Sequence, residues 1–85
     1  MKYLMQGQES IKKVEILLSA TKIEREQLVS AIYDHLCKGL SKALAADLND
    51  IKAQNLGVAI DALNEVAAKF EAYFDLRYNE LTGDK

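Results

Sequence analysis

The chain has 85 residues, a formal charge of -2, 28% charged residues and 49% hydrophobic residues. This composition is too apolar for a disordered chain and not basic enough for a dedicated nucleic-acid binder. A domain of this length buries only about 60% of the surface that its unfolded chain exposes. We therefore expect a marginally stable monomer unless a partner or very regular helix packing supports it.

Cysteine usage and the distribution of apolar residues predict where the protein resides. Cys37 is the only cysteine, so no disulfide can form within the chain, and a lone thiol is typical of a reducing cytoplasm. The amino terminus lacks the apolar stretch of a signal peptide, and no run of about 18 apolar residues occurs. We expect a soluble, cytoplasmic protein that has no contact with a membrane.

The spacing of apolar residues predicts an all-α fold. The chain has no proline and four glycines, and its apolar residues recur at intervals of three and four. We predict one domain over residues 1–85, a small helical bundle. Two long amphipathic helices would form an antiparallel hairpin with a short connecting helix. The expected bounds are a frayed segment 1–8, a helix over 9–38, a short helix over 41–51 and a helix over 56–82.

The middle of the first predicted helix has two interpretations. Thr21 and Glu24 have the spacing of a capping box, which would begin a new helix there. Lys22 and Glu26 have the spacing of a stabilising pair within one continuous helix, which is the interpretation adopted in the bounds above. Gly39 is a plausible stop for the helix end. Four turn-forming residues are the candidates to mark the turn before the body of the final helix: Asn49, Asp50, Asn55 and Gly57.

The last predicted helix has the most regular pattern in the chain. Its apolar seam alternates by four and three over nearly four heptads: Leu56, Ile60, Leu63, Ala67, Phe70, Phe74, Arg77 and Leu81. Further apolar positions widen the seam, so one facing helix would not cover it, and we predict that a second chain completes the bundle. The candidate interface residues are Leu63, Val66, Phe70, Tyr73, Phe74, Arg77, Tyr78 and Leu81. Aromatic residues and arginine often dominate binding free energy, but the same positions would also suit an internal core.

No set of residues indicates catalysis or cofactor binding. His35 and Cys37 are the only residues of their types, and two positions apart on a helix they point about 200° away from each other. They cannot complete a zinc site or pair as nucleophile and base. The carboxylates lie at helix-surface spacings, and no glycine-rich phosphate loop is present. We expect no catalytic residue, no metal and no cofactor, and we predict that the protein is not an enzyme.

Three functions are compatible with these observations. The first is a helical protein–protein interaction module, either self-associating as a homodimer or higher oligomer, or acting as an adaptor or co-chaperone for a partner helix. The second is a nucleic-acid-associated regulator, because residues 1–42 hold seven Lys and Arg against five Asp and Glu. The third is a phage or mobile-element inhibitor or immunity-type protein, because residues 43–85 hold four against eight. We favour the first.

The order of a long helix, a turn region and a second helix ending in an aromatic stretch resembles a known architecture. That stretch is Phe70-Glu71-Ala72-Tyr73-Phe74-Asp75-Leu76-Arg77-Tyr78. The order is similar to the small co-chaperones of bacterial type III secretion needles, which are helical hairpins that help to hold an aggregation-prone subunit. Small phage-encoded helical proteins are equally similar. The resemblance lies in helix lengths rather than in motifs; it implies a chaperone-like role and assigns no site residues.

Overall fold

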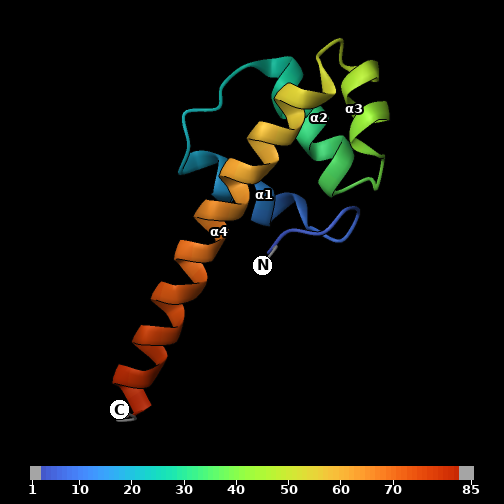
Figure 1. The fold of residues 1–85 in the computed structure, drawn as a ribbon. Helices are drawn as coiled ribbons and strands as arrows, with labels where there is room; N and C mark the ends of the chain where they lie inside the picture. The colour runs from blue at the N-terminus through green and yellow to red at the C-terminus, as the bar shows by residue number, and fades with distance from the viewer. Residues whose placement is uncertain (1–2, 83–85) are drawn as a thin grey trace.

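The computed structural model describes residues 3–82, with side chains described up to residue 78. Four helices follow one another along the chain (Figure 1). They are α1 (Ile11–Ser19), α2 (Glu26–Leu36), α3 (Lys42–Leu48) and α4 (Ala53–Thr82). No strand occurs within residues 3–82, so the predicted all-α class is confirmed.

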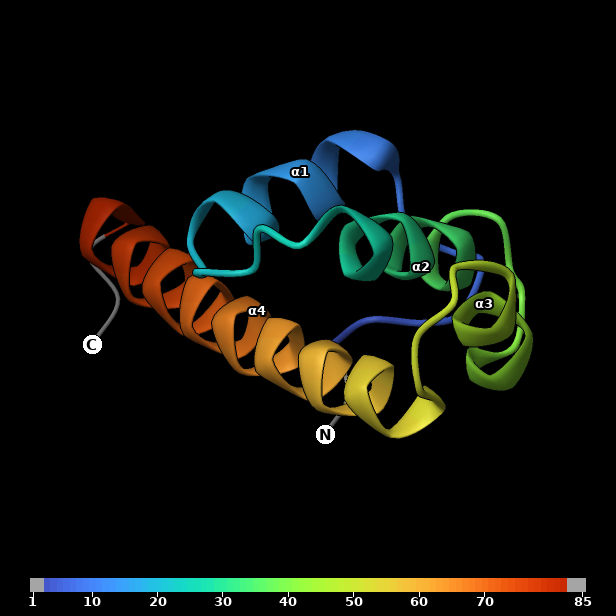
Figure 2. The same cartoon turned by 90° about the horizontal axis from the view of Figure 1, so that it is seen from above.

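One helix determines the length of the molecule. At 1.5 Å per residue, the 30 residues of α4 span about 45 Å, and the whole chain measures 50 × 23 × 21 Å. The three shorter helices and the N-terminal segment gather around the first half of α4, whereas its second half projects away from them (Figures 1 and 2). The fold is therefore a small helical body with a helical extension.

The core lies between α1, α2 and the first half of α4. Its largest fully buried side chains are Val14, Ile32, Leu36, Leu56 and Leu63. Burial of each such side chain contributes about 1.5 to 3 kcal/mol relative to exposure. Ala45 and Ala46 of α3 are also buried, and their small size allows α3 to approach the body closely. The first half of α4 is consequently held in the domain by direct packing.

The predicted helix over residues 9–38 is divided in two, so the hairpin of two long helices is not what the structure shows. α1 ends at Ser19, and residues 20–25 are not helical. The Thr21 hydroxyl donates to the Leu18 carbonyl at 2.9 Å and accepts from the Ile23 amide at 3.2 Å. Thr21 thus stabilises the end of α1 and does not cap α2, whose N-cap is Arg25 without a side-chain hydrogen bond. The break was the alternative that the capping-box spacing had left open.

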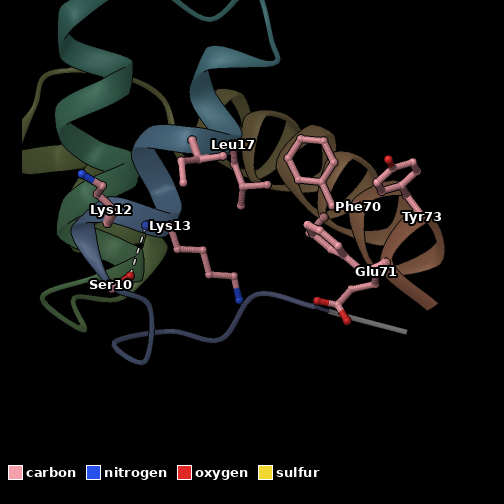
Figure 3. Close-up of a pocket in the computed structure, with 10 residues that line it drawn as sticks. Ser10, Lys12, Lys13, Leu17, Phe70, Glu71 and Tyr73 are labelled. Atoms are coloured by element: carbon pink, nitrogen blue, oxygen red, sulfur yellow. Dashed lines mark hydrogen bonds between the residues drawn. The ribbon is translucent and has the colours of Figure 1, made fainter. Parts of the chain in front are cut away.

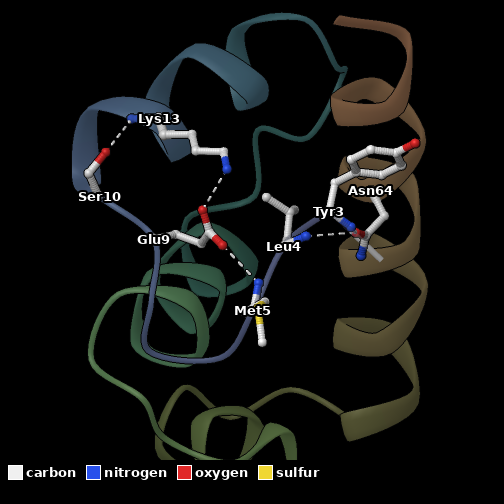
Figure 4. A network of polar contacts seen from close by, with 7 residues as sticks. All are labelled: Tyr3, Leu4, Met5, Glu9, Ser10, Lys13 and Asn64. Carbon is white, nitrogen blue, oxygen red and sulfur yellow. Dashed lines mark hydrogen bonds and ion pairs between the residues drawn. The ribbon is translucent and has the colours of Figure 1, made fainter. Parts of the chain in front are cut away.

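The N-terminal segment was expected to be frayed, but its described part, residues 3–8, packs on the body. The Asn64 side-chain oxygen accepts the amides of Tyr3 and Leu4 at 2.8 and 3.0 Å (Figure 4). Leu4 is 5% exposed. The Met5 amide donates to Glu9 at 2.8 Å. These contacts bind the segment to α4 and to Glu9, which precedes α1, while residues 1 and 2 lie outside the described part.

Two glycines allow this segment to approach the turn after α2. Gly7 and Gly39 both have positive φ, +70° and +85°, a conformation that glycine adopts without steric cost. A Cβ atom at Gly7 would lie 2.9 Å from the Gly39 Cα, so the two backbones touch. The Gly7 amide also donates to the His35 carbonyl at 3.1 Å. The N-terminal segment is thereby joined to α2 as well as to α4.

The last turn comes earlier than the sequence suggested. Asn49 is the C-cap of α3 and Asp50 has a φ of +57°, so these two residues do form the turn. Asn55 and Gly57 were expected in it, but both lie inside α4, which begins at Ala53. The buried Leu56 lies between them, and its packing into the core stabilises helical structure at positions where local preference favours a turn.

Candidate protein interaction surface

The apolar face of α4 continues past the body without a change of pattern. Residues three and four apart lie on the same face of a helix. Ile60, Leu63 and Ala67 on this face are 4%, 0% and 4% exposed. Further along the same face, Phe70 is partly buried and Phe74 is 62% exposed. One continuous face therefore changes from protein core to protein surface within two helical turns.

The structure separates the predicted interface residues into two groups. Leu63 lies in the core of this chain, and Val66 and Phe70 pack against that core. The other described members are exposed: Tyr73, Phe74, Arg77 and Tyr78. Leu81 belongs to α4, but its side chain lies outside the described residues. The exposed members, together with the edge of Phe70, form a surface that we call the aromatic face.

A groove of about 610 Å³ runs between α1 and α4 beside this face (Figure 3). Leu17 of α1 and Ala67 of α4 line it as buried residues. Ile16, which is 51% exposed, lines it from α1, and Phe70, Tyr73 and Phe74 line it from α4. The rings of Tyr73 and Phe74 meet edge to face, with centroids 5.7 Å apart. The groove is mainly apolar and adjoins the projecting part of α4.

Charged side chains line the same groove from its two helices. Lys12 and Lys13 lie on α1, and Glu71 lies on α4 (Figure 3). The Lys13 ammonium pairs with the Glu9 carboxylate at 2.8 Å, and 45% of the Lys13 side chain is exposed. Lys12 and Glu71 therefore place opposite charges on the α1 and α4 sides of the groove, while the Lys13 charge is paired with Glu9. An apolar groove with charged edges suits an amphipathic helix, whose apolar face enters the groove while its polar face stays in water.

His35 stabilises the fold through a hydrogen bond, and Cys37 is a partly buried thiol. The Nδ1 atom of His35 lies 2.8 Å from the Leu40 carbonyl. A carbonyl oxygen can only accept, so this nitrogen carries the proton, and the bond closes the turn between α2 and α3. Burial, followed by the Glu9 carboxylate, raises the pKa of the Cys37 thiol. Among the described residues, no three His, Cys, Asp or Glu side chains are placed to hold a metal ion.

A second cavity, of about 350 Å³, lies under the N-terminal segment and is lined by Leu4, His35, Lys42 and Asn64 among others. Its Asn64 and His35 side chains both bond to backbone groups of this chain. The Asn64 bonds hold the N-terminal segment on α4, and the His35 bond closes the turn between α2 and α3, so both polar groups serve the internal architecture.

The α1 side of the groove was missed by sequence reasoning. The spacing of three and four over residues 11–18 predicts a stripe of Ile11, Val14 and Leu18; the structure buries Val14 as expected and also Leu17, whereas Ile11 is 67% exposed. The run Ile16-Leu17-Leu18 was the available signal, because three consecutive apolar residues cannot all face one side of a helix. It indicated that α1 contacts the body and still leaves apolar surface outside.

Comparisons with known proteins add no family. No protein-family model matches the chain, and neither the curated proteins nor the solved structures compared with it give a match. None of the described helices is both long enough and apolar enough to cross a membrane. The similarity to helical-hairpin co-chaperones depended on two long helices, and the first of these is two short ones in the structure.

Proposed function

We propose that this chain is a non-enzymatic helical interaction module that binds another protein helix through the aromatic face and the adjoining groove. One observation carries the proposal: the core-forming face of α4 continues uncovered beyond the body. Surface apolar residues that occur singly need no explanation, whereas a contiguous patch with polar edges is typical of an interaction site. The groove between α1 and α4 extends that patch.

The size of the patch indicates binding of moderate strength. Tyr73, Phe74 and Tyr78 are 56%, 62% and 64% exposed, and an aromatic side chain can bury about 200 Å². Covering the three rings would then remove about 350 Å² of surface from water, worth about 9 kcal/mol before costs. Association itself costs about 4 to 15 kcal/mol. The rings alone are therefore insufficient for tight binding, and a partner must also use the groove.

Photocross-linking at matched positions of α4 tests the proposal. A photoreactive phenylalanine analogue is placed at position 74 or at position 76 in the cells that produce the chain. Leu76 is a close control because it is 60% exposed, nearly equal to Phe74, and lies about 200° around the same helix. We expect a covalent adduct from position 74 and much less from position 76.

The mass of the adduct separates the two forms of the proposal. An adduct of twice the chain mass indicates self-association, and a different mass indicates an adaptor or co-chaperone role toward another protein. Equal or absent adducts at the two positions would overturn the proposal, because Phe74 would then contact protein no more than Leu76 does on the other side of Phe74's helix.

A further inference from the structure

Resting on the proposed function, we infer that the occupant of the groove is the end of α4 from a second copy of this chain, bound antiparallel. Each copy has a groove beside Phe70 and a projecting helix that starts from the same place. A two-fold axis near Phe74 would place the projection of each copy in the groove of the other. Such a contact closes on itself as a dimer and leaves neither aromatic face exposed.

The register follows from helix geometry. In an antiparallel pair centred at Phe74, a residue three or four positions after 74 lies beside a residue three or four positions before it in the other copy. Tyr78 of the second copy then lies at the level of Phe70, and Arg77 lies at the level of Glu71. Phe70 and Glu71 both line the groove. The last turns of α4 are thus brought to the groove and to α1.

Charge complementarity supports this direction. The α1 edge of the groove carries Lys12 and Lys13, whereas residues 71–78 carry two acidic residues and one basic residue. The last turn of α4 contains no basic residue, so the negative end of its helix dipole is not offset there. The antiparallel arrangement brings this negative end to Lys12 and to Lys13, of which Lys13 also pairs with Glu9 of its own chain. A parallel arrangement would place two negative ends side by side.

The area that the aromatic rings can bury in a dimer is too small unless the groove is also used. Tyr73, Phe74 and Tyr78 of two copies would bury about 700 Å² in total, whereas specific protein interfaces bury at least about 1,200 Å². Contact between rings alone is therefore too small. Insertion of the α4 end between α1 and α4 adds Ile16 and the apolar stems of Lys12 and Lys13, which long charged side chains commonly contribute to an interface.

Cross-linking between two chains tests the antiparallel arrangement of the dimer. Both chains carry Cys37→Ala, one also carries Lys13→Cys, and the other carries Tyr78→Cys. The mixture is treated with a short bismaleimide after sedimentation has shown that it still associates. We expect a 13–78 product. In the antiparallel pair, two thiols at position 78 are about 12 Å apart along the helix axis, so little 78–78 product should form.

Charge reversal provides a second measurement with a matched control. Lys12→Glu with Lys13→Glu should raise the dimer dissociation constant about tenfold at low salt, and the effect should shrink as salt screens the charges. Lys22→Glu with Lys52→Glu makes the same change in net charge at exposed positions that do not line the groove. This control pair should leave the constant near the wild-type value.

Each outcome bears on a different statement. A dimer that gives the 78–78 product and no 13–78 product overturns the antiparallel arrangement. The proposed function as an interaction module would not be affected. Equal effects of the two lysine double substitutions on the dimer dissociation constant would likewise overturn the antiparallel arrangement. A wild-type chain that remains monomeric overturns the second copy as occupant. In that case, an adduct of another mass from position 74 in cells would still support the proposed function, and its absence would remove both.

Discussion

Replacement of Asn64 by alanine tests whether the N-terminal segment is part of the folded domain. The Asn64 oxygen accepts two backbone amides, those of Tyr3 and Leu4. Loss of two such bonds costs about 1 kcal/mol each. If the segment then leaves the body, the burial of Leu4, worth about 1.5 to 3 kcal/mol, is lost as well. We expect Asn64→Ala to lower the free energy of unfolding by about 2 to 5 kcal/mol.

Urea unfolding at one fixed protein concentration measures this loss, because association would otherwise contribute to apparent stability. Asn55→Ala is the control, since Asn55 is exposed in the first turns of the same helix, and it should change stability by less than about 0.5 kcal/mol. A double-mutant cycle with Leu4→Ala should show coupling of at least about 1 kcal/mol. Equal effects of Asn64→Ala and Asn55→Ala, or strict additivity with Leu4→Ala, would refute the reasoning.

Three further predictions concern the turns, the thiol and a helix cap. Gly7→Ala should destabilise by at least about 1 to 2 kcal/mol in urea unfolding, because alanine is strained at a φ of +70° and its Cβ meets Gly39; an unchanged midpoint would contradict this. Burial and then Glu9 raise the pKa of the Cys37 thiol, and the thiolate is the reactive form. The midpoint of the pH dependence of its alkylation should therefore lie above that of the urea-unfolded chain, and equal midpoints would contradict this. Ser41→Ala should cost about 1 kcal/mol, because the hydroxyl caps α3; thermal unfolding checks this.

The sequence predicted the features that depend on spacing within one helix. The heptad seam from Leu56 to Phe74 located the face of α4 that forms the core and then the aromatic face. Ser41 begins the predicted short helix over 41–51, and in the structure its hydroxyl accepts the amide three residues on, at Leu44. Such features are local, and a periodic apolar face has few alternatives to helix. The class of the fold followed for the same reason.

Features that depend on tertiary contact could not be predicted in this way. Nothing near Tyr3 and Leu4 in the sequence indicates a partner sixty residues away, yet Asn64 holds them. Thr21 had a local pattern compatible with either a break or a continuous helix, and in the structure its hydroxyl bonds to the Leu18 carbonyl at the end of α1. The groove could not be predicted for a related reason. Its α1 side lies beside α4 only because the chain leaves the helix and turns back after Ser19.

Solution mass as a function of concentration tests the central claim most directly, namely that the aromatic face is the binding surface and its occupant a second copy. Sedimentation equilibrium would compare wild type with Phe74→Asp and Leu76→Asp, which alter residues of nearly equal exposure about 200° apart around α4. We predict that wild type and Leu76→Asp rise from 9.5 kDa toward twice that mass, while Phe74→Asp stays at the monomer mass with unchanged helicity. A wild type that stays at 9.5 kDa, or equal behaviour of the two variants, would contradict the account.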